Sequence, residues 1–390
     1  VTTPMVSYAV PFLKADLGIV ITASHNPPSY NGFKLKGSYG GPLLPEDVKE
    51  VEKLIPQNCP DDFDKYPFDY YVEKGLIEIT DLENIYIKRV EEVFSLDKIR
   101  NSNFEFAFDA MYGAGQKVIK RLFPDITFLH CENNPTFEGI PPEPLLRNLQ
   151  EFAEVIKLSE NIDCGLAVDG DADRLAMFDD KGNYIDSHHI LLLLIHYLAG
   201  YKGLKGKVGA GFSSSVKINA LSKYYGLDME IVPIGFKHLC GIMLREKVLV
   251  GGEESGGIAI AGHIPERDGI WNGITLWNFM TETGKSIREL IEEIYKIVGP
   301  FAFERSDLHL DKTLKEKIVN NCLNNKYKEF GKYKVQRVET LDGFKYYFND
   351  SEWLLIRPSG TEPVLRTYAE SHTREEALDI LKSAYETITK

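Results

Sequence analysis

Short apolar runs, each ending in a turn of small or acidic residues, recur along the first half of the chain. They lie at Leu17–Thr22, Phe104–Phe108, Cys164–Val168 and Lys207–Ala210, and helix-like segments follow them. This alternation of strand, loop and helix is typical of α/β domains. Ligands of such domains bind beyond the carboxyl ends of the strands, so we expect the functional residues of this chain in the turns.

Apolar residues with a helical period fill the stretches between these runs. The predicted helices are Glu46–Ile55, Leu82–Leu96, Asn148–Leu158, Ser187–Leu198, Val216–Tyr225 and Ser286–Val298. From about Phe301 the pattern changes to a strand, a helix, an alternating stretch with a hairpin turn at Asp342-Gly343, and a closing helix. These elements are predicted at Ala302–Leu310, Thr313–Asn324, Tyr333–Phe348 and Thr373–Thr389. Thr373 and Glu376 form a capping box at the start of the last helix. We expect a separate α+β domain here, with its boundary near Gly299-Pro300.

Composition narrows the class of protein. The chain has 390 residues, which predicts about two to four domains. Its formal net charge is −13, and such a surface repels nucleic acid, so an anionic ligand must be held by local basic groups. Its five cysteines form no C-x-x-C pair, which suits a reducing cytoplasm. The longest apolar run, Ile190 to Ala199, is about half the length that spans a bilayer. We therefore expect a cytoplasmic protein that binds neither nucleic acid nor membrane.

The most specific signal is the alternation of three aspartates, Asp169, Asp171 and Asp173, in the segment 169–174, here called the acidic loop. Several carboxylates that converge on one point are the ligands of a hard divalent cation. Gly170 and Ala172 are small enough to let the loop curve tightly. An EF-hand calcium loop is excluded, because its sixth position requires glycine and Arg174 stands there.

Ser24 lies in the segment Thr22–Pro27, here called the serine loop, and Pro27 and Pro28 stiffen its exit. A serine hydroxyl needs a base or a metal to become a good nucleophile. His25 is expected not to aim its ring at Ser24, because adjacent side chains diverge. No Ser–His pair is therefore predicted. Without the acidic loop, the serine loop would be interpreted as a structural turn.

Two further segments carry polar groups suited to a sugar phosphate. The segment 251–257, here called the glutamate loop, offers Glu253, Glu254 and Ser255, which suit the vicinal hydroxyls of a sugar. The segment 357–363, here called the arginine segment, combines a guanidinium, two hydroxyls and a turn, which are the parts of a phosphate cradle. Four other cations stand near these motifs: Lys34, Arg174, Lys237 and Arg267.

Taken together, these four segments resemble the α-D-phosphohexomutases, which interconvert the 1- and 6-phosphates of hexoses. The phosphoserine loop of that family is similar to the serine loop and its continuation Asn31–Lys34, and the family's other three motifs match the acidic loop, the glutamate loop and the arginine segment in order. The resemblance implies three related α/β domains and a smaller C-terminal α+β domain round a central cleft. We place them at 1–97, expected to be incomplete at its N-terminus, then at 98–200, 201–298 and 299–390.

The same resemblance implies roles for individual residues. Ser24 would carry the phosphoryl group and, with Asp169, Asp171 and Asp173, bind Mg²⁺. Lys34 and Arg174 would assist catalysis, and Lys34 is our candidate for proton transfer, which requires a lowered pKa. The residues expected to bind substrate are His25, Lys237, Glu253, Ser255, Arg267, Arg357, Ser359, Gly360 and Thr361. A hexose 1,6-bisphosphate would be both intermediate and activator.

The substrate is expected to be glucose 1-phosphate or glucose 6-phosphate, because Glu253-Glu254-Ser255 is similar to phosphoglucomutase-type loops. A phosphomannomutase or a dual-specificity enzyme is the alternative within the class, and a phosphoglucosamine mutase fits less well. An inactive sugar-phosphate-binding relative is the alternative from another class. The protein would be a monomer or a homodimer that acts on small hexose phosphates.

Overall fold

The computed structural model of the chain describes residues 1–58, 65–358 and 364–390. These residues form two compact units, and each is described by itself. The first unit comprises Val1–Leu175, Asp180–Gly182 and Gly262–Thr281. The second unit comprises Ala176–Asp179, Asn183–Ala261 and Glu282–Lys390.

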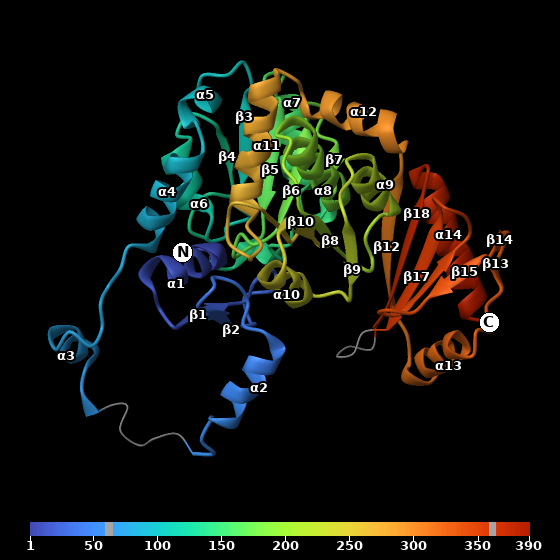
Figure 1. Cartoon of the computed structure of the whole chain (residues 1–390), viewed down its shortest axis with the longest axis horizontal. Coiled ribbons are helices and arrows are strands. Elements are labelled where there is room, and N and C mark those ends of the chain that lie inside the picture. Colours follow the sequence, from blue (N-terminus) through green and yellow to red (C-terminus); the bar gives the residue numbers. More distant parts are fainter. Residues whose placement is uncertain (59–64, 359–363) are drawn as a thin grey trace. The chain divides into compact units, whose positions relative to one another are not determined.

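The first unit contains an antiparallel hairpin and three parallel strands in the order β4-β3-β5 (Figure 1). Its strands are β1 (Leu17–Thr22), β2 (Gly32–Gly37), β3 (Phe106–Asp109), β4 (Thr127–Leu129) and β5 (Cys164–Val168). Its helices are α1 (Thr3–Leu13), α2 (Pro45–Lys53), α3 (Phe68–Glu73), α4 (Leu82–Val93), α5 (Leu96–Arg100), α6 (Gln116–Leu122), the short η2 (Phe137–Gly139) and η3 (Leu146–Asn148), α7 (Gln150–Leu158) and most of α11 (Gly269–Thr283). All five residues of β5 are buried, so the loop that follows it starts from a fixed point of the core.

The first part of the second unit contains a four-stranded sheet in the order β11-β10-β8-β9. The strands of this sheet are β8 (Lys207–Gly211), β9 (Met229–Val232), β10 (Val248–Gly252) and β11 (Ile258–Ile260). Two further strands, β6 (Leu175–Asp179, from Ala176 on) and β7 (Tyr184–Ile185), pair with each other antiparallel. Its helices are α8 (Ser187–Ile195), η4 (His196–Tyr201), α9 (Val216–Tyr224), α10 (Phe236–Arg245) and α12 (Ile287–Val298).

The C-terminal part of the second unit is an antiparallel sheet in the order β12-β18-β17-β16-β15, with α14 packed on it (Figure 1). The strands of this sheet are β12 (Ala302–His309), β15 (Arg337–Glu339), β16 (Phe344–Tyr347), β17 (Trp353–Pro358) and β18 (Val364–Ser371). A separate two-stranded sheet consists of β13 (Glu329–Phe330) and β14 (Tyr333–Lys334). Its helices are α13 (Lys312–Leu323) and α14 (Arg374–Ile388). The predicted capping box of Thr373 and Glu376 is confirmed.

Most predicted elements are confirmed to within a few residues, and the misses have physical reasons. Strand β3 begins at Phe106 rather than Phe104. Helix α1 was not predicted, because it contains Pro4 and Pro11, and proline is usually unfavourable inside a helix. Helix α11 was missed because it is buried on nearly every side and so lacks an amphipathic period. Within the three described ranges, no helix is both long and apolar enough to cross a membrane.

Candidate active site

The three aspartates of the acidic loop form one buried group, here called the aspartate cluster. The exposed fractions of Asp169, Asp171 and Asp173 are 0%, 3% and 0%. One carboxylate oxygen from each lies within 4.8 Å of the other two. Three buried oxygens (Oδ2 of Asp169, Oδ1 of Asp171 and Oδ1 of Asp173) have no hydrogen-bond partner among the described residues. Unsatisfied buried carboxylate oxygens are costly, so this donor set fits a divalent cation.

Small residues give the acidic loop its curvature, as predicted. Ala172 adopts a left-handed backbone conformation with φ 58°. At Gly113, in the loop after β3, a Cβ would come within 2.6 Å of the Gly170 carbonyl oxygen, and Ala114 donates its amide to that same oxygen at 2.9 Å. The loop after β3 therefore supports the acidic loop by backbone contact.

The serine loop lies directly against the acidic loop. A Cβ at Gly170 would collide with the carbonyl oxygen of Ser24, so only glycine at position 170 permits this approach. The amide of Ser24 donates to the Oγ1 of Thr22 at 2.8 Å. Two segments that are far apart in the sequence thus meet at a single point, as the resemblance required.

The expectation that His25 cannot aim its ring at Ser24 is wrong. The Nδ1 of His25 lies 3.5 Å from the Oγ of Ser24. Ser24 has a φ of 53°, and this left-handed conformation turns two adjacent side chains toward each other. Burial, reinforced by the charge of Arg174, lowers the pKa of His25 to about 4, so its ring is neutral at pH 7.

Three cations surround the aspartate cluster. The Nζ of Lys34 lies 2.8 Å from Asp171 and 3.3 Å from Asp173. Arg267 forms an ion pair with Asp173. Arg174 donates its backbone amide to Asp169 at 3.0 Å, and its side-chain Nε lies 3.9 Å from that carboxylate. The structure thus brings together every predicted site residue of the first unit.

The charges within this group shift the pKa values in opposite directions. Burial, together with the carboxylates of Asp173 and Asp171, raises the pKa of Asp169 well above its usual range. Burial alone would also raise the pKa of Asp173, but the neighbouring cations, Arg267 first, hold it below that range. The lowered pKa that Lys34 was expected to need is not found. Burial lowers its pKa, but Asp173 and Asp171 outweigh burial and raise it.

Residues that sequence reasoning missed hold this group in place. The hydroxyl of Thr3 donates to Asp171 at 2.6 Å from the first turn of α1. A buried ion pair joins Lys36 on β2 to Glu266, which also accepts from the hydroxyl of Ser7 at 3.2 Å. Because Arg267 follows Glu266 in the sequence, this ion pair fixes β2, the strand that carries Lys34, relative to Arg267. No local pattern marks these residues.

The glutamate loop lies in the second unit, at the end of β10. Glu253 is buried and accepts from the amide of Gly235 at 2.7 Å. The carboxylate of Glu254 accepts from the hydroxyl of Ser213, and its backbone carbonyl accepts from Ser187. Ser255 is half-buried. Hydroxyls and a backbone amide thus hold both glutamates of the loop.

The remaining predicted residues of the second unit are only partly described. Arg357 is at the end of β17, and its Nε donates to Asp342 at 3.0 Å. Lys237 is exposed in the first turn of α10. Ser359, Gly360 and Thr361 lie outside the described residues, so the predicted cradle of the arginine segment stays a prediction.

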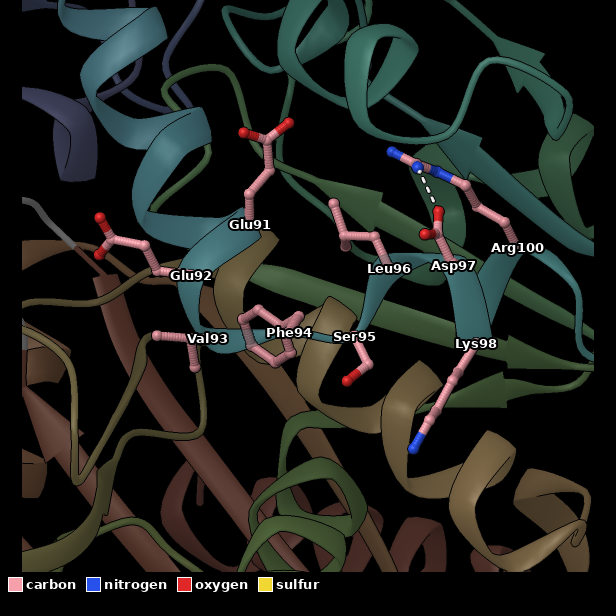
Figure 2. A pocket seen from close by; sticks show the side chains of 9 residues that line it. All are labelled: Glu91, Glu92, Val93, Phe94, Ser95, Leu96, Asp97, Lys98 and Arg100. Atoms are coloured by element: carbon pink, nitrogen blue, oxygen red, sulfur yellow. Dashed lines mark hydrogen bonds and ion pairs between the residues drawn. The ribbon is translucent and has the colours of Figure 1, made fainter.

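A surface pocket of about 550 Å³ lies where α4 ends and α5 begins (Figure 2). It is lined by Glu91, Glu92, Val93, Phe94, Ser95, Leu96, Asp97, Lys98 and Arg100, none of which is a predicted site residue. Arg100 is paired with Asp97 at 3.0 Å, so this cation is already engaged. The lining does not present the converging charges of a phosphate site.

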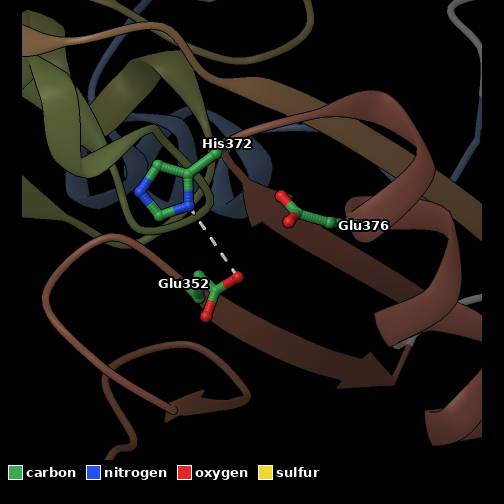
Figure 3. Close-up of side chains that lie close together, drawn as sticks. All are labelled: Glu352, His372 and Glu376. Atoms are coloured by element: carbon green, nitrogen blue, oxygen red, sulfur yellow. Dashed lines mark ion pairs between the residues drawn. The ribbon is translucent and has the colours of Figure 1, made fainter.

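A second group that could hold a metal consists of Glu352, His372 and Glu376 (Figure 3). The hydroxyl of Ser371 donates to Glu352 at 2.6 Å, and Glu376 accepts from the amide of Thr373 in the capping box of α14. His372 is half exposed and lies 4.0 Å from Glu352. Local hydrogen bonds therefore account for these carboxylates, in contrast to the orphaned oxygens of the aspartate cluster.

Four family models match successive parts of the chain. Their descriptions are phosphoglucomutase/phosphomannomutase alpha/beta/alpha domain I, domain II, domain III and C-terminal domain, and they match residues 1–60, 84–182, 186–298 and 317–386. The matches confirm the predicted fold class of three α/β domains followed by a C-terminal domain.

Individual relatives agree with these models. The phosphoglucosamine mutase of Methanococcus maripaludis is 30% identical over 392 residues, which cover 98% of this chain and 83% of the relative. The phosphoglucomutase/phosphomannomutase of Thermococcus kodakarensis is 28% identical over 97% of this chain and 80% of the relative. A crystal structure of a Thermus thermophilus protein assigned as a phosphomannomutase matches all of this chain and 82% of its own, with a TM-score of 0.83 and 28% identity.

Fold, site and relatives together define a sugar-phosphate mutase. The chain belongs to the α-D-phosphohexomutase family.

Proposed function

We propose that this chain interconverts glucose 1-phosphate and glucose 6-phosphate through a phosphoserine at Ser24 and a hexose 1,6-bisphosphate. The observation that carries the proposal is the set of three orphaned carboxylate oxygens in the aspartate cluster, buried directly beside the serine loop. Burying such a group without a cation destabilises the folded protein. A cation beside a serine loop suits phosphoryl transfer.

The aspartate cluster would hold Mg²⁺ through those three oxygens, together with Ser24. When bound, Mg²⁺ neutralises charge on the phosphoryl group that is transferred. Arg174 and Arg267 already lie against the aspartates and add positive charge at the same place.

In the transfer step, the bond between phosphorus and the Ser24 oxygen breaks as the sugar hydroxyl oxygen bonds to phosphorus. The hydroxyl proton must leave at the same time. Lys34 remains our candidate for this proton transfer, because a divalent cation on Asp171 and Asp173 would offset the negative charge that raises its pKa. His25, which is neutral and faces the Ser24 oxygen, would contact the phosphoryl group.

The predicted site residues of the second unit would bind sugar hydroxyls and phosphate. Glu253 and Ser255 would accept and donate hydrogen bonds to sugar hydroxyls, and Arg357 would bind the phosphate that is not reacting. We further propose that Lys237, Ser359, Gly360 and Thr361 contribute to phosphate binding. Because the bisphosphate returns its other phosphate to Ser24, the sugar must bind in two orientations. The domain boundaries 1–97, 98–200, 201–298 and 299–390 belong to the same proposal.

Mannose and glucosamine phosphates are the second candidate substrates. The names of the relatives support them, since the Methanococcus maripaludis protein is a phosphoglucosamine mutase and the Thermococcus kodakarensis protein a phosphoglucomutase/phosphomannomutase. Glucose, mannose and glucosamine phosphates differ only at C2. We propose that the glutamate loop supplies the discrimination.

The test is a coupled assay on the 1-phosphates of glucose, mannose and glucosamine, with and without Mg²⁺, each with a trace of the matching bisphosphate. We expect turnover with Mg²⁺ and loss of turnover after chelation, with glucose 1-phosphate giving the highest kcat/KM. A higher kcat/KM for mannose or glucosamine would reassign the substrate. Binding of the sugar phosphates without any turnover would identify an inactive relative.

A further inference from the structure

Asp342 joins two parts of the second unit that the proposed function assigns to substrate. It lies in the turn between β15 and β16, and 23% of its side chain is exposed. One carboxylate oxygen accepts from the Nε of Arg357 at 3.0 Å. The other accepts from the backbone amide of Ile234 at 2.8 Å, 108 positions earlier in the chain. Both oxygens are therefore used, one on each partner.

The turn is built to lie against Arg357. Gly343 has a φ of 96°, and a Cβ there would come within 2.8 Å of the Ile356 carbonyl oxygen and 3.2 Å of the Arg357 Cα. Only glycine accommodates both this conformation and this approach. The backbone conformation of this turn thus places the carboxylate of Asp342 next to the guanidinium of Arg357.

The second arm of the contact reaches the glutamate loop. Ile234 is followed by Gly235, whose amide donates to the Oε1 of Glu253 at 2.7 Å. Gly235 has a φ of 131°, which residues other than glycine rarely adopt. A continuous path of hydrogen bonds and one peptide unit therefore connects Arg357, Asp342 and Glu253.

The proposed function assigns both end residues of this path to the ligand. Arginine presents five N–H donors, and the contact with Asp342 uses the one on Nε. A carboxylate has about four lone-pair positions, and Gly235 occupies one of those on Glu253. An anion bound by Arg357 and a hydroxyl bound by Glu253 would then stand at a fixed separation.

We propose that Asp342 is a positioning residue that fixes the separation between Arg357 and Glu253, and so selects ligands that carry a phosphate and sugar hydroxyls on one rigid ring. This inference rests on the proposed function. It predicts that Arg357 and Glu253 act as a coupled pair in binding, and that the coupling depends on Asp342.

A double-mutant cycle tests the coupling. Calorimetry gives the Kd of glucose 6-phosphate for wild type, Arg357→Lys, Glu253→Gln and the double variant, and the same four are measured with Asp342→Ala added. With Asp342 present, the effect of the double variant should depart about tenfold from the product of the single effects. With Asp342→Ala, the single effects should multiply. Inorganic phosphate, which has no sugar ring, should show no coupling in either background.

The matched control is Asp379→Ala, which removes a carboxylate paired with Lys332 and Tyr333 in the same C-terminal part of the unit. It should leave the coupling intact. The melting temperature shows whether Asp342→Ala folds. If it does not, the isosteric Asp342→Asn is used instead, because asparagine has one side-chain oxygen where aspartate has two and so cannot accept from both Arg357 and Ile234 in the same way.

The outcomes separate this inference from the proposed function. Coupling that persists unchanged without Asp342 overturns the positioning role, whether or not the wild type is a mutase. Coupling that disappears while the wild type shows no turnover supports the positioning role and overturns the mutase. If the wild type does not bind glucose 6-phosphate at all, both are overturned.

Discussion

The two groups of predicted site residues are built by different means. In the first unit, charged side chains meet one another: Lys34 and Arg267 face the aspartate cluster, and three carboxylate oxygens are left over. In the second unit, Glu253 is held by a backbone amide, and Glu254 by hydroxyls. The first arrangement leaves unpartnered carboxylate oxygens that suit a divalent cation. The second leaves directed hydrogen-bonding groups, which suit recognition of a neutral ring.

This contrast predicts how each unit responds to mutation and to a change of pH. Charge removal should act most strongly in the first unit, because its buried ions depend on each other. In the second unit, Glu253 and Glu254 are held by neutral donors, and His188 is buried without a hydrogen-bond partner in the described part of the chain, so changes at such groups should alter affinity or pH dependence instead.

The largest effect is expected for Ser24→Ala, which removes the proposed phosphoryl carrier. Turnover of glucose 1-phosphate should fall by about 10³-fold or more, because the variant lacks the oxygen that is proposed to carry the phosphoryl group. Ser29→Ala, at an exposed serine just beyond the same loop, should retain activity. Near-normal steady-state rates for Ser24→Ala would remove the covalent mechanism.

Lys36→Met should destabilise the first unit by about 3–5 kcal/mol, since it leaves the Glu266 carboxylate buried without its partner. The exposed fractions of the two side chains are only 2% and 0%. Lys53→Met breaks an exposed pair with Glu50 and should cost less than about 1 kcal/mol. Denaturant unfolding measures both, and equal losses would contradict the contrast between buried and exposed pairs.

His188 in the second unit should make stability depend on pH. Burial lowers its pKa from the ordinary 6.5 to about 4, and neither ring nitrogen has a hydrogen-bond partner in the described part of the chain. Between these pH values the unfolded chain binds a proton that the folded chain does not. The stabilisation is therefore complete above about pH 6.5 and is lost as the pH falls toward 4, by up to about 3 kcal/mol.

The measurement is the difference in unfolding free energy between wild type and His188→Leu across this pH range, in which the other titrations cancel. The wild type should lose stability relative to the variant as the pH falls. A difference that stays constant from pH 7 to pH 4 would show that His188 is not buried as a neutral ring.

The smallest effect is expected for Arg357→Ala, which removes one phosphate-binding side chain but no reacting group. KM for glucose 1-phosphate should rise about tenfold while kcat changes little. Arg374→Ala, at an exposed arginine paired with Glu304, is the control and should leave KM unchanged. A fall in kcat without a change in KM would assign Arg357 to the chemical step instead.

Local patterns predicted the elements and the candidate loops well. Strand β5 and the capping box of α14 follow from a few adjacent residues, and so does the tight curvature around Gly170 and Ala172. The turn at Asp342-Gly343 was also predicted from its residues. Its partners were not, because Ile234 lies 108 positions away.

The misses within the candidate site share one cause, which is that contacts between distant segments set the geometry. The left-handed conformation of Ser24 turns His25 toward it, against the expectation for adjacent side chains. The carboxylates that raise the pKa of Lys34 come from the acidic loop. The pairing of Lys36 with Glu266 spans 230 positions and leaves no mark in either local segment.

The central claim is that Ser24 carries a phosphoryl group beside a metal site, and transfer of that group tests it most directly. Purified protein is incubated with glucose 1,6-bisphosphate, with and without Mg²⁺, and its intact mass and peptides are measured. We predict a gain of one phosphate, located on Ser24 and dependent on Mg²⁺, and none in Ser24→Ala. A protein that gains no phosphate, or gains it on another residue, would contradict the account.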